Sequence, residues 1–315
     1  MTFHQPPKSR RALFCVVSLG FFCVLPACAT SCSPSPRAAP DVSQRLVELR
    51  AVNNDRNMTG GPCSQAIVEA YLRLFPSPAD AELEHASTDD LRNRITAALI
   101  VSGHQLHDPV SNEGLRLLHA LERRGQLTET DASRLHRIFI DERRFSEASQ
   151  LQRRFPTLEA IPHLERQPIQ ATRTVWRVTP ERALSQMDAP ALEGAQLLVI
   201  GDPRCHFTVR AAEAIDDDAD MGPLFEDSIW LVPPGPSLNM NAITEWEAQF
   251  PWAPLSLANQ RAEWPQVDDW ATPNFYFLRD GVVEATVVGW PKEGRKTELM
   301  EAAAKVGLRS NRLQP

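Results

Sequence analysis

The spacing of apolar side chains changes character near the middle of the chain. Between residues 41 and 165, apolar positions recur every three or four residues, and Ile67, Tyr71, Leu74 and Phe75 illustrate this stripe. The period is typical of amphipathic helices, in which such positions share one face. The sequence therefore predicts an all-helical N-terminal domain over residues 41–165.

Residues that start and stop helices frame these stripes. Asp41 and either Ser87 or Thr88 precede helical stretches, where a side-chain oxygen can accept from the first free backbone N–H groups. Pro76 and Gly125 follow two of the stretches and favour helix ends. We therefore expect several separate helices joined by short turns.

A weak internal repeat runs through this region. "LHALERRGQL" begins at Leu118 and "LHRIFIDERRF" at Leu135, a separation of 17 residues, which is half of the 34-residue period of tetratricopeptide-type hairpins. Ala148 would be the small packing residue of a second helix. An ordinary helical bundle is the alternative interpretation. His119 and His136 occupy equivalent places in the two segments, which favours packing as their role.

The second half, over residues 168–309, mixes short apolar runs with helical stretches, and residues 157–175 read as a linker before it. The sequence predicts the order β-α-β-α-β-α-β-β-α, a central mixed sheet flanked by helices. The predicted strands are 174–178, 195–201 and 228–234, the predicted helices are 180–187, 204–215, 241–250 and 292–308, and a hairpin over 274–290 turns at Asp280-Gly281.

The N-terminus predicts export. Three basic residues precede the apolar run 12–27, so residues 1–27 read as a signal peptide. The sequence Leu25-Pro26-Ala27-Cys28 resembles a bacterial lipobox, which implies lipidation of Cys28, an anchor and flexible tether over 28–40, and a lipoprotein facing the periplasm. Ala29 after the modified cysteine favours the outer membrane by the same resemblance.

Other interpretations of this segment stay open. Ala27 and Ala29 also fit an ordinary cleavage site, which would leave a secreted or soluble periplasmic protein. A lipobox ending at Cys32 or an uncleaved anchor are further alternatives. If Cys28 is lipidated, the thiols that remain are Cys32, Cys63 and Cys205, an odd number that argues against a disulfide framework.

Composition and missing motifs exclude several classes of function. The 315 residues carry a formal charge of −7 without a long basic run, so nucleic acid is not an expected partner. The chain lacks a P-loop, a dinucleotide-binding glycine motif and the common hydrolase signatures. We therefore expect neither a nucleotide nor any other cofactor.

One stretch, "QLLVIGDPRCHFTVRAAEAI", carries candidate chemistry. It places Cys205 between a buried strand and the first turn of a helix, where free N–H groups and the helix dipole favour a thiolate. His206 and Arg204 could add positive potential. This sequence resembles the strand and active-site turn of the thioredoxin fold, and "ATPNFYFLRDGVV" and "VVGW" are similar to that family's cis-proline loop, hairpin and C-terminal end.

The resemblance implies a redox site with two departures. Cys205 would be the nucleophile, and Thr272 and cis-Pro273 would present backbone to a peptide, with Trp270 lining the groove. Thr208 stands where the family has its second cysteine, so a mixed disulfide would need an external thiol, Cys63 or Cys32 for resolution. Val199 replaces a buried acidic group, which leaves His206 as the candidate base.

No metal site is expected. His104 and His107, with Asp108 beside them, could hold a metal ion, but no further strong ligand is evident in the sequence. The acidic run 216–220 reads as a solvated helix end. Two hypotheses about function follow. The chain is either an envelope-anchored monothiol thiol-disulfide oxidoreductase acting on exported proteins or peptides, or a redox-inactive protein-binding module at the membrane.

Overall fold

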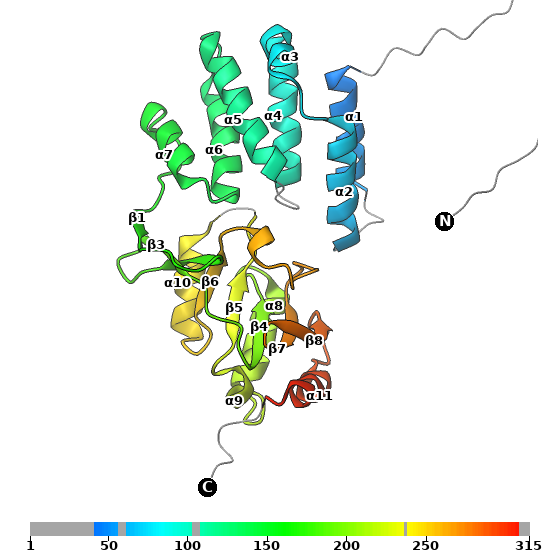
Figure 1. Ribbon diagram of the computed structural model, residues 1–315, viewed down its shortest axis with the longest axis vertical. Coiled ribbons are helices and arrows are strands. Elements are labelled where there is room, and N and C mark those ends of the chain that lie inside the picture. The colour runs from blue at the N-terminus through cyan, green and yellow to red at the C-terminus, as the bar shows by residue number, and fades with distance from the viewer. Residues whose placement is uncertain (1–40, 56–60, 103–107, 236–237, 309–315) are drawn as a thin grey trace, which may run out of the picture. The chain divides into compact units, whose positions relative to one another are not determined.

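The computed structural model describes residues 41–55, 61–102, 108–235 and 238–308. Residues 40–315 form one compact unit, in which a helical region precedes a mixed eight-stranded sheet with helices (Figure 1). The predicted signal peptide, anchor, tether and lipidation site at Cys28 lie outside the described residues, as do Cys32, His104 and His107. Among the described residues, no helix has the length and apolarity needed to cross a bilayer.

The structure describes seven helices in the N-terminal region, and it confirms the two predicted helix caps. The Asp41 carboxylate accepts from the Gln44 N–H at 2.8 Å, and Ser87, rather than Thr88, accepts from the Asp90 N–H at 3.0 Å. The helices are α1 (Val42–Asn53), α2 (Gly61–Leu74), α3 (Asp80–His85), α4 (Thr88–Ser102), α5 (Asp108–Arg123), α6 (Glu129–Asp141) and α7 (Phe145–Arg154).

A buried polar network joins three of these helices. Tyr71 of α2 donates to Glu113 of α5 at 3.1 Å, and Arg94 of α4 donates to the other oxygen of the same carboxylate at 3.0 Å. Desolvation raises the pKa of Glu113, and the Arg94 charge opposes that shift. Because each buried group has a partner of opposite or complementary character, the network fixes how the three helices pack.

The sheet has the order β1-β3-β2-β6-β5-β4-β7-β8. β4, β5 and β6 run parallel to one another, while β7 is antiparallel to β4 and to β8. The strands are β1 (Leu164–Arg166), β2 (Thr174–Val178), β3 (Leu184–Asp188), β4 (Ala195–Ile200), β5 (Ile229–Val232), β6 (Leu255–Ala258), β7 (Asn274–Arg279) and β8 (Val282–Val288).

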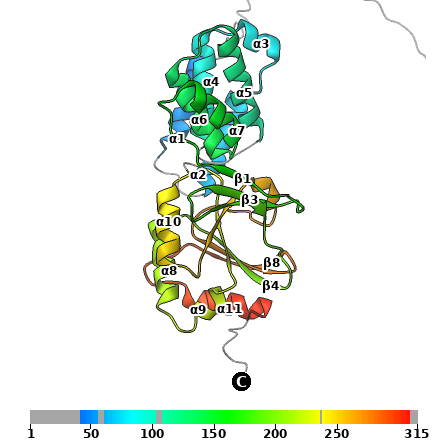
Figure 2. The same cartoon turned by 90° about the vertical axis from the view of Figure 1, so that its left-hand side faces the viewer.

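Four helices follow or separate these strands: α8 (His206–Asp216), α9 (Gly222–Phe225), α10 (Met240–Gln249) and α11 (Lys296–Val306). The connections β4-α8-β5 and β5-α10-β6 step across the sheet in the same direction. Since parallel crossovers are right-handed, both helices must cover the same face, as Figure 2 shows. Loop residues such as Leu192, Trp264 and Val267 cover the opposite face.

The predicted helix over residues 180–187 is wrong. Residues 184–188 form β3, which pairs antiparallel with β2 through a tight turn in which the Arg182 N–H donates to the Thr179 carbonyl at 2.8 Å. The segment contains helix-forming residues, but Leu184 is buried in the core and its backbone completes the ladder. Pairing with a neighbouring strand outweighs the propensity of so short a segment. Strands β1 and β6 and helix α9 were also not predicted.

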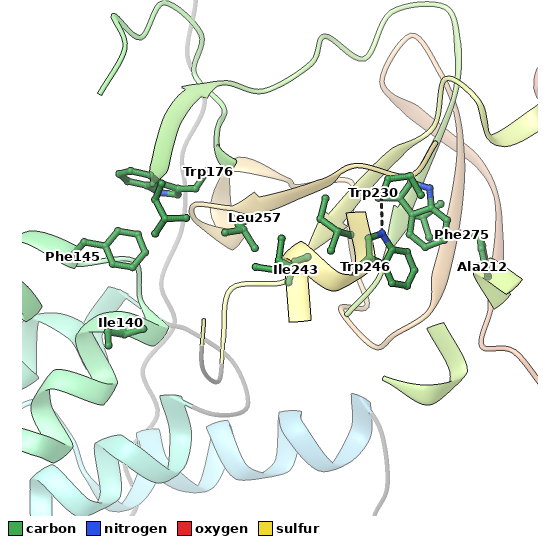
Figure 3. Packing of buried hydrophobic residues seen from close by; sticks show 14 of the residues in the cluster. Ile140, Phe145, Trp176, Ala212, Trp230, Ile243, Trp246, Leu257 and Phe275 are labelled. Atoms are coloured by element: carbon green, nitrogen blue, oxygen red, sulfur yellow. Dashed lines mark hydrogen bonds between the residues drawn. The ribbon is translucent and has the colours of Figure 1, made fainter. Parts of the chain in front are cut away.

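One of the three hydrophobic clusters among the described residues spans both the helical region and the sheet. Phe145 of α7 packs edge-on against Trp176 of β2, with ring centroids 5.1 Å apart. The same cluster continues from Ile140 through Leu257 to Trp230 and Phe275 inside the sheet layer (Figure 3). An apolar cluster that is continuous across both regions couples their stabilities, because neither surface would be covered if the other region unfolded.

We predict that the full chain unfolds in a single transition. The Phe145→Ala variant should lose about 3 to 5 kcal/mol of unfolding free energy, because Phe145 is completely buried. During denaturation, circular dichroism reports on the helices and tryptophan fluorescence on the core of the sheet. In the variant, both denaturation curves should shift by the same amount relative to the parent chain. Two separate transitions, with only one shifted, would instead favour independent domains over 41–165 and 168–309.

Candidate functional site

Cys205 caps the first turn of α8, directly after the turn that leaves β4. Its N–H donates to the Asp202 carbonyl at 2.9 Å, and its own carbonyl accepts from the Val209 N–H at 3.0 Å. Asp202 also organises the turn through its side chain, which accepts from the Arg204 N–H at 2.8 Å and pairs with the Arg204 guanidinium at 3.0 Å. The thiol therefore stands on a turn held mainly by one aspartate.

The Cys205 thiol meets the loop before β7. Its Sγ lies 3.3 Å from the Thr272 carbonyl oxygen, to which it donates a hydrogen bond. The Thr272-Pro273 bond is cis, as the sequence predicts. Cys205 and Thr272 are half-buried, and Pro273 is buried. The structure thus brings together three of the residues chosen from the sequence, while their roles in catalysis and binding stay predictions.

Tyr276 anchors the loop that carries Thr272. Its single O–H is shared between two acceptors, Asp268 Oδ1 at 2.9 Å and the Asp269 carbonyl at 2.7 Å, and its oxygen accepts from the Asp269 N–H at 3.0 Å. Asn274 adds a bond from its side-chain amide to the Asp269 carbonyl at 3.2 Å. Burial raises the pKa of Tyr276, and the Asp268 carboxylate raises it further. The tyrosine therefore stays neutral and keeps the loop in place.

Thr208, three residues after Cys205, is a core residue. It is completely buried, and its hydroxyl accepts from the Asp202 N–H at 3.5 Å. A Cβ placed on Gly201 would come within 3.0 Å of the Thr208 methyl group and 3.2 Å of the Trp230 ring. Gly201 is thus required by close packing, and Thr208 helps to close the turn beneath Cys205.

His206 is exposed, and its ring lies against Phe207 with centroids 3.8 Å apart. Within the described residues, no hydrogen bond joins His206 to the Cys205 thiol. Trp270 is half-buried and lies under the Arg261 guanidinium, 5.0 Å from the ring centroid. Burial lowers the pKa of Arg261 to about 10, and the Asp269 charge opposes that shift. Trp270 is therefore occupied by a cation-π contact.

The structure also places the histidines, the acidic run and the cysteine that the sequence singled out. His136 is buried, and desolvation lowers its pKa, whereas His119 is exposed, so the packing prediction fails for His119. Asp218 and Asp220 of the acidic run are not merely solvated, because both pair with Lys296 of α11 at 2.8 Å. Among the described residues, no group of histidine, cysteine and carboxylate side chains could hold a metal ion. Cys63 lies in α2.

Several residues of the site were not chosen from the sequence. Asp202 could have been found, because an Asp-Pro pair after a strand is a turn signal. Tyr276 and Arg261 could not, since their contacts depend on loops that meet only in the folded chain. Arg143, in the turn between α6 and α7, also reaches this edge of the sheet.

Comparisons with known proteins add little to this geometry. No protein-family model matches the chain, and no curated protein matches it. Among solved structures, a thioredoxin-like protein from Bacteroides caccae is similar at 10% identity, over 84% of this chain and 95% of that one, with a TM-score of 0.28. The function is therefore inferred from the residues and contacts of the chain itself.

We predict that ionisation of tyrosine opposes folding at high pH. The chain has two tyrosines, Tyr71 and Tyr276, and burial raises the pKa of both. A group with a raised folded-state pKa contributes stability below its ordinary value, about 10 for tyrosine, and that contribution is lost as the pH rises further. Denaturation curves across this range should show a falling free energy of unfolding, with a shallower fall in Tyr276→Phe.

The same variant should lose about 1 to 3 kcal/mol at neutral pH, because the Asp269 N–H loses its acceptor. Tyr71→Phe is the matched comparison: it removes the other hydroxyl with a raised pKa and should also make the fall shallower, but it leaves the Asp269 N–H its acceptor. If the slope against pH is the same in Tyr276→Phe as in the parent chain, Tyr276 does not hold the raised pKa.

Proposed function

We propose that the region within residues 168–309 is a thioredoxin-like domain in which Cys205 performs monothiol thiol-disulfide exchange on exported proteins or peptides. Support for the fold comes from the chain's own topology. β4-α8-β5 supplies two parallel strands and the helix that carries the thiol, and β7-β8-α11 supplies an antiparallel pair and a closing helix. The observation that carries the activity is the thiol's position, 3.3 Å from the carbonyl before a cis proline.

The exchange needs only one protein sulfur. The Cys205 thiolate would attack one sulfur of a substrate disulfide, so that a Cys205-substrate disulfide forms as the substrate S–S bond breaks. The departing thiolate takes a proton from water or from His206, which is exposed beside the thiol. A second thiol from solution then attacks the mixed disulfide and releases Cys205 as thiolate, leaving the substrate sulfur bonded to the incoming thiol.

Backbone near Thr272 would hold the substrate chain. The Thr272 carbonyl faces the thiol, and its loop is fixed by Tyr276 and Asn274. Polar main-chain groups beside a reactive sulfur can bind an extended peptide without demanding a particular sequence. Trp270, half-buried under the Arg261 guanidinium, would offer the rest of its ring to the substrate chain.

A non-catalytic binding module is the second candidate. It is favoured by Thr208, which is completely buried and packs close to Gly201, so that a packed side chain without a thiol occupies this position. A domain with this fold and without a resolving thiol would use the loop of Thr272 to bind chains without exchanging disulfides.

We predict that Thr208→Cys confers dithiol activity. A sulfur at this position lies one helical turn from Cys205 and can resolve a mixed disulfide internally. Insulin reduction in the presence of dithiothreitol should proceed at least tenfold faster than with the parent chain. Thr208→Ser is the matched control, because it keeps the hydroxyl that accepts from Asp202 N–H and adds no thiol. Equal rates for both variants would count against a reactive Cys205.

Mixed disulfides in cells separate the two candidate functions. Acid quenching and thiol blocking of cells that express the parent chain should preserve Cys205-linked proteins, visible as high-mass bands that reductant removes. Cys205→Ala should abolish them. A band pattern unchanged by that substitution would leave the binding module as the better account.

The proposed anchor has its own test. Cys28→Ala should remove acyl labelling with a radioactive fatty acid and shift the chain from the detergent phase to the aqueous phase on phase partition. Cys32→Ala is the control for the alternative lipobox and should leave both unchanged. If Cys32→Ala removes the label and Cys28→Ala does not, Cys32 is the modified residue. If the parent chain takes up no label, the segment is a cleaved or uncleaved signal without lipid.

A further inference from the structure

The turn that ends α6 contains an arginine in a conformation that favours glycine. Arg143 has a φ of 58°, and its N–H donates to the Ile140 carbonyl while the Arg144 N–H donates to the Phe139 carbonyl. These two bonds define a Schellman motif with Arg143 as the left-handed residue. A β-carbon is disfavoured in that conformation.

Two other helices end in the same motif with glycine. After α5, Gly125 has a φ of 62°, with bonds from its own N–H and the next N–H to Glu122 and Leu121 carbonyls. After α11, Gly307 has a φ of 69° and the equivalent pair of bonds. At both of these helix ends, glycine takes the left-handed position. At Arg143 the backbone strain points to a role for the side chain.

The Arg143 side chain leaves its own helix and reaches the sheet. The residue is 8% exposed. One terminal nitrogen lies 3.4 Å from the Ile140 carbonyl oxygen, and the other lies 3.5 Å from that of Pro233, which directly follows β5. Its Nε is buried and has no hydrogen-bond partner among the described residues. The guanidinium is therefore held in the interior by few and long hydrogen bonds.

Two carboxylates stabilise this buried charge. Burial lowers the pKa of Arg143 to about 10, while Asp141 and Asp202 act in the opposite direction. Asp202 is the residue that organises the turn of Cys205. β4 and β5 are parallel neighbours, and the Gly201 N–H donates to the Leu231 carbonyl at 3.1 Å. Pro233, which accepts from Arg143, and Asp202 thus follow neighbouring parallel strands at the end of the sheet that carries the thiol.

We infer that Arg143 is a positioning residue for Cys205: it links the α6–α7 turn of the helical region to the two loops that follow β4 and β5. Its hydrogen bond to the Pro233 carbonyl joins the helical region to the loop that follows β5, which lies beside the end of β4. Asp202, which shapes the thiol turn, favours the charged form of the buried guanidinium. The helical region thereby sets how far the Cys205 turn can open. The catalytic meaning of this link rests on the proposed function, but the link itself can be measured without it.

Arg143→Gly is the informative variant, because glycine keeps the left-handed turn and removes only the side chain. Arg182→Gly is its matched control. Arg182 also has a positive φ, 63°, but its side chain is exposed in the β2–β3 turn and bonds to Asn241. Arg143→Lys keeps the charge toward Asp202 without the planar fork.

The experiment measures amide hydrogen exchange and Cys205 alkylation by iodoacetamide in the full chain, each at the same interval below the variant's own unfolding midpoint. Peptide mass spectrometry isolates residues 198–210 and 229–235 and distinguishes Cys205 from the other cysteines. In Arg143→Gly, exchange in these two segments should accelerate at least tenfold and alkylation at least threefold. Arg182→Gly should match the parent chain, and Arg143→Lys should lie between.

Other outcomes overturn the inference. Unchanged exchange in both segments, or a uniform acceleration over all peptides, would make Arg143 a packing residue only. An unchanged or slower alkylation of Cys205 would separate Arg143 from the thiol. Mixed-disulfide trapping in the same variants keeps the two proposals apart. If no variant traps a partner while exchange changes as expected, the proposed function fails and the positioning role stands.

Discussion

The antiparallel pairing of β4 with β7 is the constraint on which the site depends. Its register places Ile200, the last residue of β4, opposite Asn274, the first residue of β7. The chain that leaves β4 and the chain that enters β7 must then meet at one edge of the sheet. Cys205 and Thr272 face each other for this reason, and a slip of one residue would turn every side chain of β7 to the other face. The β4–β7 ladder already brings these two loops together, and the hydrogen bonds of Tyr276 and Asp202 then fix their conformations.

Local signals in the sequence predicted much of this arrangement. The apolar runs at 195–201 and 228–234 became central strands, because strands buried on both faces need uninterrupted apolar residues. Asp280 and Gly281 turn the β7–β8 hairpin with φ values of 50° and 78°, the pair of positive angles that such a turn requires. The approach of Cys205 to Thr272 followed from a family resemblance, not from periodicity.

What escaped prediction depends on contacts between distant segments. The β3 strand exists because its backbone completes a ladder with β2, and β6 has four residues, too few to show a period. The cation-π contact of Trp270 was also not predicted, because nothing in the sequence places Arg261 over its ring. Arg143 resembles any other surface arginine in the sequence, and only the folded turn reveals its left-handed backbone and buried charge. These are properties of tertiary structure, which local propensity does not carry.

The placement of α11 has a consequence for the order in which the chain acquires its structure. Leu299, Ala302, Ala303 and Val306 belong to the same apolar cluster as Leu83 and Leu91 near the start of the helical region. The last helix that the structure describes therefore supplies part of an interior begun more than two hundred residues earlier. Until Val306 has left the ribosome, that interior stays open to water at one end, and the nascent chain presents a surface that chaperones would recognise.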